Sequence, residues 1–258
     1  MDEVTTTGPL YSENPRKERE NTQLSMAAVL VQEILGVKAQ LEAISIIRKN
    51  QPKRDSTIIR AIVTLADGRK TGLMDLGICK DTREEIEIFS HEATHLVLLG
   101  EKRDQTLLEQ AVEDGVADLV GLETADRMLN EMRKGAEISA RKSFYQRVCR
   151  DKEAEIREAI PLVGQNGPPR IIVVAEGEGP YHLLGRNFVF SLSEYFPDVS
   201  IATLRQFFLE KPPDLEDLFT PEKYIRENSG KLCSSPPVSL TEEAKKIFVY
   251  ETERRRLF

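Results

Sequence analysis

The feature that most constrains the fold is a pair of histidines four residues apart, in His91-Glu92-Ala93-Thr94-His95. Histidine is rare in this chain, with three among 258 residues, so composition alone does not account for the spacing. Residues at positions i and i+4 lie on one face of an α-helix, where two imidazoles can reach the same metal ion. Glu92 would then point at a water on that metal. The motif predicts a helix with one metal-binding face.

The residues around the motif predict a helix from about 83 to 99. Asp81 or Thr82 can cap its N-terminus, and Gly100 can end it. Apolar residues between the polar positions, such as Ile88, would hold this helix against a core. The alternative is two helix histidines with no shared role, which the helical context disfavours.

A catalytic zinc site needs a third protein ligand, with a water in the fourth position. The next acidic segment offers Asp114, which follows His95 after 18 intervening residues. Asp118 lies four positions later on the same helix face, and Gly115 would let two helices approach closely. Glu113 is an alternative third ligand, rotated by about 100° around the helix relative to Asp114.

These motifs resemble those of the gluzincin zinc metallopeptidases, the aminopeptidase-like and thermolysin-like enzymes, in which an acidic ligand on an antiparallel helix follows H-E-x-x-H. The resemblance implies that His91, His95 and Asp114 bind zinc. It also implies that Glu92 is the general base and that Asp118 orients a zinc-binding histidine. The family ligand is glutamate, whereas this chain has the shorter aspartate, which serves as third ligand in the aspzincin group.

Hydrolysis of an amide also requires a hydrogen-bond donor where negative charge develops. Tyr181 and His182 follow Gly179 and Pro180 at the start of another predicted helix. Their position resembles that of the transition-state tyrosine of aminopeptidase-like gluzincins, and thermolysin-like enzymes use a histidine for the same purpose. The resemblance implies that Tyr181 or His182 stabilises the oxyanion. Either residue can instead be packed at the start of the helix.

The predicted strand before the zinc helix contains Gly72-Leu73-Met74-Asp75. It resembles the stretch with which the aminopeptidases hold a substrate's free amine, although Asp75 replaces a glutamate and the distance to His91 is too short. The alternative is an ordinary strand of a hairpin. In either case, the strand would present an edge to which an extended peptide could add.

The rest of the chain predicts a mixture of helices and strands. Residues 1–22 are polar and interrupted by proline and glycine, so we expect a flexible tail before a domain over 23–258. Apolar spacing over 24–47 predicts one bent helix or two short ones, with Gly36 as the weak point. Two β-rich segments on either side of a turn at 66–68 predict a β-hairpin.

Asp104 can cap a further helix that continues through Leu122. Later elements are expected as a helical stretch to 160, a strand over 170–175, a helix over 181–196 and more helices towards the C-terminus. The expected fold class is α+β. A small sheet, the zinc helix and the acidic helix would form a zincin-like core, followed by a mostly helical C-terminal subdomain from about 176.

Composition and charge narrow the functional classes. The net charge of -7 argues against an extended nucleic-acid surface. No apolar stretch reaches the roughly 20 residues of a membrane-spanning helix, and the N-terminus lacks the basic and apolar regions of a signal peptide. We therefore expect a cytoplasmic protein with no membrane or nucleic-acid partner. Three scattered cysteines do not indicate a thiolate zinc site.

The sequence therefore predicts a zinc metallopeptidase, a hydrolase that cleaves peptide or protein substrates with a zinc-activated water and Glu92 as general base. The alternative is a non-catalytic, zinc-binding regulatory or interaction protein that has a zincin-like fold. Glu92 favours the enzyme, because a purely structural zinc site has no use for a base at an open coordination position.

Overall fold

The computed structural model describes residues 15–48, 60–64, 66–75, 79–99, 106–160, 179–234, 238 and 248–253. Within these residues, three strands follow the first helix, only helices follow as far as Ser234, and a last strand lies at 248–253. In chain order the elements are α1 (Pro15–Leu35), β1 (Ala43–Arg48), β2 (Arg60–Thr64), β3 (Lys70–Asp75), α2 (Thr82–Leu99), α3 (Leu107–Leu129), α4 (Lys134–Asp151), α5 (Glu153–Ala159), α6 (Pro180–Tyr195), α7 (Ile201–Glu210), α8 (Leu215–Phe219), α9 (Pro221–Ser234) and β4 (Phe248–Glu253). The fold is therefore α+β.

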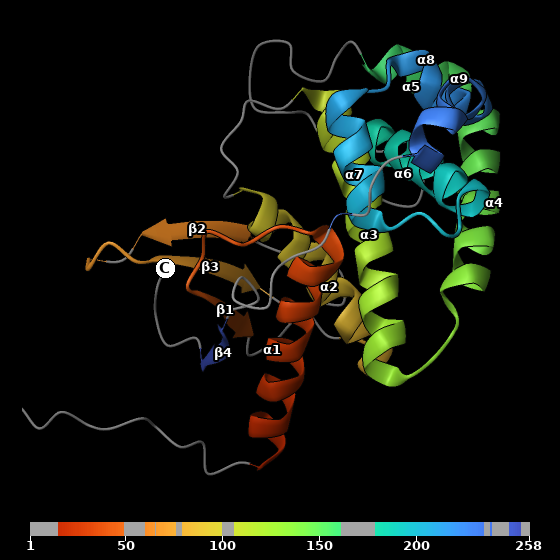
Figure 1. Cartoon of the computed structure of the whole chain (residues 1–258). Helices are drawn as coiled ribbons and strands as arrows, with labels where there is room; N and C mark the ends of the chain where they lie inside the picture. The colour runs from red at the N-terminus through yellow and green to blue at the C-terminus, as the bar shows by residue number, and fades with distance from the viewer. Residues whose placement is uncertain are drawn as a thin grey trace, which may run out of the picture.

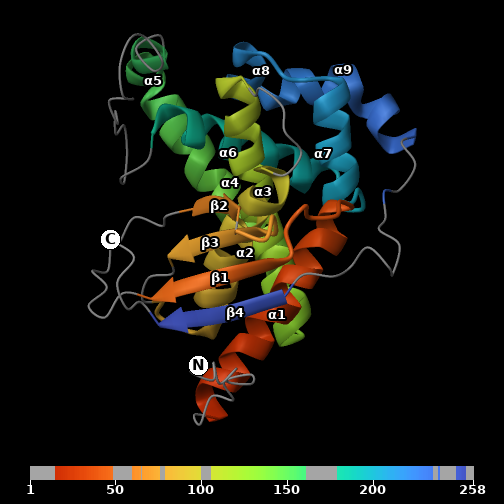
Figure 2. The ribbon, with the colours of Figure 1, turned by 90° about the vertical axis from the view of Figure 1, so that its left-hand side faces the viewer.

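The sheet has the strand order β2-β3-β1-β4. β1 is parallel to both β3 and β4, whereas β2 and β3 form an antiparallel pair. The pairing of β2 with β3 confirms the predicted hairpin. Figure 2 shows one face of the sheet towards the viewer, with α1 and α2 behind it.

The sequence prediction of a helix over 24–47 is wrong beyond residue 36. α1 ends at Leu35, directly before Gly36, which has a φ of 64°, a conformation that glycine adopts without steric cost. Buried Gln32 stabilises this turn, because its side-chain oxygen accepts a hydrogen bond from the backbone N–H of Ala39. The chain then forms β1, in which Ile44 and Ile46 are both fully buried on the same face of the strand.

The two ends of the described chain also differ from the predictions. α1 begins at Pro15, so residues 15–22 belong to a helix and the boundary of the predicted tail was placed too late. Residues 1–14 lie outside the described residues. At the other end, β4 was expected to be helical, but it pairs with β1 along its whole length.

The helices that carry the candidate site begin at identifiable caps. Asp81 caps α2, because its carboxylate accepts a hydrogen bond from the N–H of Glu84 at 2.9 Å. α3 has a capping box formed by Thr106 and Glu109, and it runs through Leu122 to Leu129, within the stretch predicted to remain helical to about 160. The predicted cap Asp104 and the predicted strand over 170–175 lie outside the described residues. α6 confirms the helix predicted over 181–196.

A single hydrophobic core joins the sheet to the helices. Its buried side chains come from the sheet and from every helix from α1 to α9. Figure 1 shows the sheet on the left, α2, α3 and α7 in the middle, and α4, α5, α6, α8 and α9 towards the right. Within the described residues, no helix combines the length and the apolar character that a membrane crossing requires.

α3 and α6 cross with their backbones in close contact at two glycines. A β-carbon on Gly115 would lie 2.7 Å from the carbonyl oxygen of Gly185. A β-carbon on Gly185 would overlap the carbonyl oxygen of Ala111. The close approach predicted from Gly115 is thus confirmed, and it brings the residue beside it, Asp114, against α6.

We expect Gly185→Ala to lower the free energy of unfolding by at least about 3 kcal/mol, the upper end of the range for overpacked cores. The added methyl group meets backbone and not a flexible side chain, so the two helices must separate. Chemical denaturation would measure the loss. Gly135→Ala is the matched control, because nothing lies within 4 Å of its β-carbon, and it should stabilise α4 by about 0.5–1 kcal/mol. A Gly185→Ala protein as stable as the wild type would contradict the close crossing.

Candidate metal centre

Three side chains from α2 and α3 converge with the spacing of metal ligands. Nε2 of His91 and Nε2 of His95 are 3.3 Å apart, and Oδ1 of Asp114 lies 3.5 Å and 3.6 Å from them. Ligand atoms about 2.0–2.1 Å from a tetrahedral zinc ion are about 3.4 Å apart, so the three atoms fit one face of such a site. This group, His91, His95 and Asp114, can hold a metal ion.

Each imidazole is oriented by a second carboxylate. Nδ1 of His91 is 2.7 Å from Oδ1 of Asp118, and Nδ1 of His95 is 3.1 Å from Oε1 of Glu113. Metal-binding histidines commonly contact a carboxylate through the other ring nitrogen, which fixes the ring and its tautomer. The two Nε2 atoms are thereby directed towards Asp114.

This arrangement separates the two candidates for the third ligand. Asp114 contributes an oxygen to the group, whereas Glu113 contacts the far side of the His95 ring. The rotation of about 100° between neighbouring helix residues therefore gives the two carboxylates different tasks. The contact between Glu113 and His95 was not foreseen from the sequence, although it follows from the helix geometry once Asp114 is placed.

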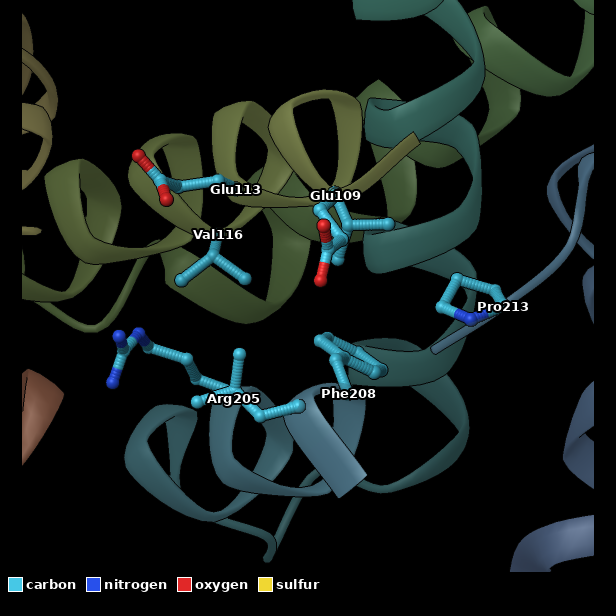
Figure 3. A pocket seen from close by; sticks show the side chains of 8 residues that line it. Glu109, Glu113, Val116, Arg205, Phe208 and Pro213 are labelled. Atoms are coloured by element: carbon cyan, nitrogen blue, oxygen red, sulfur yellow. The ribbon is translucent and has the colours of Figure 1, made fainter. Parts of the chain in front are cut away.

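Glu113 also lies at the edge of a hollow between α3 and α7. Figure 3 shows Glu109 and Val116 on one side of it and Arg205 and Phe208 on the other, with the Glu113 carboxylate turned away from Phe208. The hollow has a volume of about 30 Å³, which is too small for a peptide. We assign it no binding role.

The second oxygen of Asp114 faces α6. Oδ2 is 3.0 Å from Nδ1 of His182 and 3.0 Å from Nε of Arg186. The same Nε of Arg186 is 2.9 Å from Oδ2 of Asp118. His182 was predicted as a site residue and does reach the group. Arg186 was missed, and the one signal for it is its position four residues after His182 on a helix.

The surroundings of Asp114 and Asp118 keep both carboxylates ionised. Burial alone would raise the pKa of Asp114, but contacts with His182, His91 and His95 and the charge of Arg186 hold it well below its usual value. Burial likewise acts against the charge on Asp118, yet His91 and Arg186 lower its pKa. The pKa of His91 is raised to about 10, because its contacts with Asp114 and Asp118 outweigh the effect of burial. Both carboxylates thus keep the charge that a metal cation requires.

Glu92 lies next to the metal-binding group on α2. Its residue is 7% exposed, and Oε1 is 4.0 Å from Nε2 of His91. Glu92 and His91 line a cavity of about 300 Å³, together with Asp118, Arg186 and residues of α2 and α4. The predicted base therefore faces a space that can hold several waters or part of a ligand.

The two predicted oxyanion donors occupy different surroundings. The Tyr181 hydroxyl donates a hydrogen bond to the carbonyl of Ile160, at the end of α5. His182 is 54% exposed and contacts Asp114. The geometry thus brings His182, and not the Tyr181 hydroxyl, to the metal-binding group.

The strand before α2, β3, does not present a free edge, contrary to the prediction. β3 pairs with β2 on one side and with β1 on the other. Met74 is fully buried, and Gly72 packs against Leu41 and Leu96. The stretch Gly72 to Met74 therefore has the packing of an ordinary central strand. Among the described strands, β2 and β4 form the edges of the sheet.

No known protein family, curated protein or solved structure matches the chain. Function must therefore be argued from the chemistry of the site. Two imidazoles, one carboxylate, a neighbouring glutamate and an adjacent cavity are the groups from which that argument starts.

Proposed function

We propose that the protein is a zinc-dependent peptidase, with His91, His95 and Asp114 as metal ligands. The observation that carries the proposal is the convergence of these three side chains, with the ring of each histidine fixed by a further carboxylate. Three protein ligands and an open position are typical of catalytic zinc, whereas structural zinc is usually enclosed by four. The small sheet together with α2 and α3, the helices that carry the three ligands, suits a zincin-like core.

The residues around the ligands suit hydrolysis of an amide. When bound, zinc would polarise a water and lower its pKa towards about 7. Glu92 is positioned next to His91 at the cavity, so its carboxylate would accept the proton of the attacking water and pass it to the leaving amine. The proposed substrate is a peptide or a protein.

We assign stabilisation of the oxyanion to His182. The His182 imidazole contacts Asp114 and is exposed enough to meet a substrate. The Tyr181 hydroxyl instead donates its hydrogen bond to the backbone carbonyl of Ile160. A donor aimed at the developing negative charge is commonly among the largest contributions to catalysis of acyl transfer.

The same histidine supports a second candidate function. Nδ1 of His182 is 3.0 Å from Asp114, so a rotation of its side chain could supply a fourth ligand. A closed site with four protein ligands would be structural, as in a regulatory zinc-binding protein. Glu92 would then have no chemical task, which is why we place this function second.

The protein purified without chelator is expected to carry about one zinc ion per chain, because three preorganised ligands are present. Elemental mass spectrometry would give the stoichiometry, and thermal unfolding with and without a chelator would show stabilisation by the bound metal. A protein that contains no zinc, and gains no stability when zinc is added, would remove the basis of both candidate functions.

A further inference from the structure

Arg186 occupies a position that neither the metal ligands nor the base account for. Its side chain is only 15% exposed. Its guanidinium carbon lies 5.9 Å from the centre of the Tyr145 ring on α4, a distance at which a cation and an aromatic face attract each other. The arginine is thus held between α4 and the two carboxylates of α3.

The two carboxylates share this one cation through equivalent atoms. Nε of Arg186 is within 3.0 Å of Oδ2 of Asp114 and of Oδ2 of Asp118. The Oδ1 atoms have other tasks. Oδ1 of Asp114 faces the two histidines, and Oδ1 of Asp118 contacts His91.

We propose that Arg186 is a positioning residue that makes Asp114 a ligand through one oxygen only. Nδ1 of His182 also lies 3.0 Å from Oδ2, so the arginine and His182 together hold this oxygen. Oδ1 is then the oxygen directed at the metal, and an open coordination position is preserved. By holding Asp118 as well, the arginine couples the angle of the ligand carboxylate to the orientation of the His91 ring. The inference rests on the proposed metal site and extends it to a residue of α6.

Coordination geometry is a better test than affinity. Removing Arg186 would take away a nearby positive charge, and this loss would strengthen binding of a cation. The same change would free the Asp114 carboxylate from its fixed orientation, which would weaken binding. These effects oppose each other. A carboxylate that can turn both oxygens towards the metal, however, raises the coordination number whatever the affinity.

Cobalt(II) in place of zinc reports the coordination number of the bound metal, because four-coordinate cobalt absorbs visible light much more strongly than five- or six-coordinate cobalt. The wild type should give intense visible bands, and the molar absorbance should fall by about half or more in Arg186→Gln. Arg141→Gln is the matched control, because Arg141 lines the same cavity but pairs with Glu87, and it should keep the wild-type spectrum.

Circular dichroism would establish that each variant is folded. Should Arg186→Gln fail to fold, Arg186→Lys replaces it, because lysine keeps the charge but lacks the planar guanidinium that meets both carboxylates. A folded Arg186 variant with the wild-type spectrum would overturn the positioning role and leave the metal site intact. A wild-type protein that binds neither cobalt nor zinc would instead overturn the proposed function, and this inference with it.

Discussion

Asp114→Ala is expected to lower zinc affinity by more than about 100-fold. Loss of a residue that contacts a ligand but not the metal typically lowers metal affinity by about 10- to 100-fold. The substitution removes a metal–oxygen bond and a charge that opposes the cation. Glu113→Ala and Asp118→Ala each remove a carboxylate that orients one histidine ring, so each should lower zinc affinity by no more than about 10- to 100-fold. Competition with a chromogenic chelator would rank the three variants.

The three variants are matched, because each removes one acidic side chain from the same stretch of α3. Asp114→Asn should be included, since it keeps the shape of a buried side chain that also meets Arg186. Circular dichroism of the metal-free proteins would separate loss of a ligand from loss of the fold. Greater loss of zinc in Glu113→Ala than in Asp114→Ala would transfer the ligand role to Glu113.

The parts of the fold that the sequence predicts well are those with local signals. Asp81 before α2 and the turn at 66–68 act within a few residues, and both elements are present. β1 was missed because Ile44 also fits a helical spacing, and only residues 36–42, which begin with the turn at Gly36, separate β1 from α1. The pairing of β4 with β1 joins distant parts of the chain, so no local pattern encodes it.

The residues of the candidate site also differ in whether a local sequence pattern predicts them. His91 and His95 are fixed by helix periodicity, and Asp114 could be placed because one helix directly follows the other. Arg186 could not be predicted, because it reaches the carboxylates only through the crossing of α3 and α6. That crossing depends on two glycines far apart in sequence. Their effect on a site beside them appears only when both helices are packed.

Glu92→Gln is expected to keep the zinc content and the fold but to lower peptide cleavage by at least about two orders of magnitude, since a positioned general base contributes roughly 10²- to 10⁴-fold. The amide has nearly the same shape as the carboxylate, and Glu92 is not one of the three grouped ligands. An amide cannot accept the proton of the attacking water. Cleavage of a mixed peptide library, followed by mass spectrometry, would measure the loss.

Glu84→Gln provides the matched control, because Glu84 lies on the same helix and lines the same cavity, but pairs with Lys80 near the start of α2. It should cleave the library as the wild type does, so that a loss confined to Glu92→Gln reports on the base and not on the charge of the cavity. A Glu92→Gln protein with wild-type activity would exclude Glu92 from the mechanism. A wild type that holds zinc but cleaves no peptide would favour the regulatory zinc protein, because a protein without turnover has no use for the base.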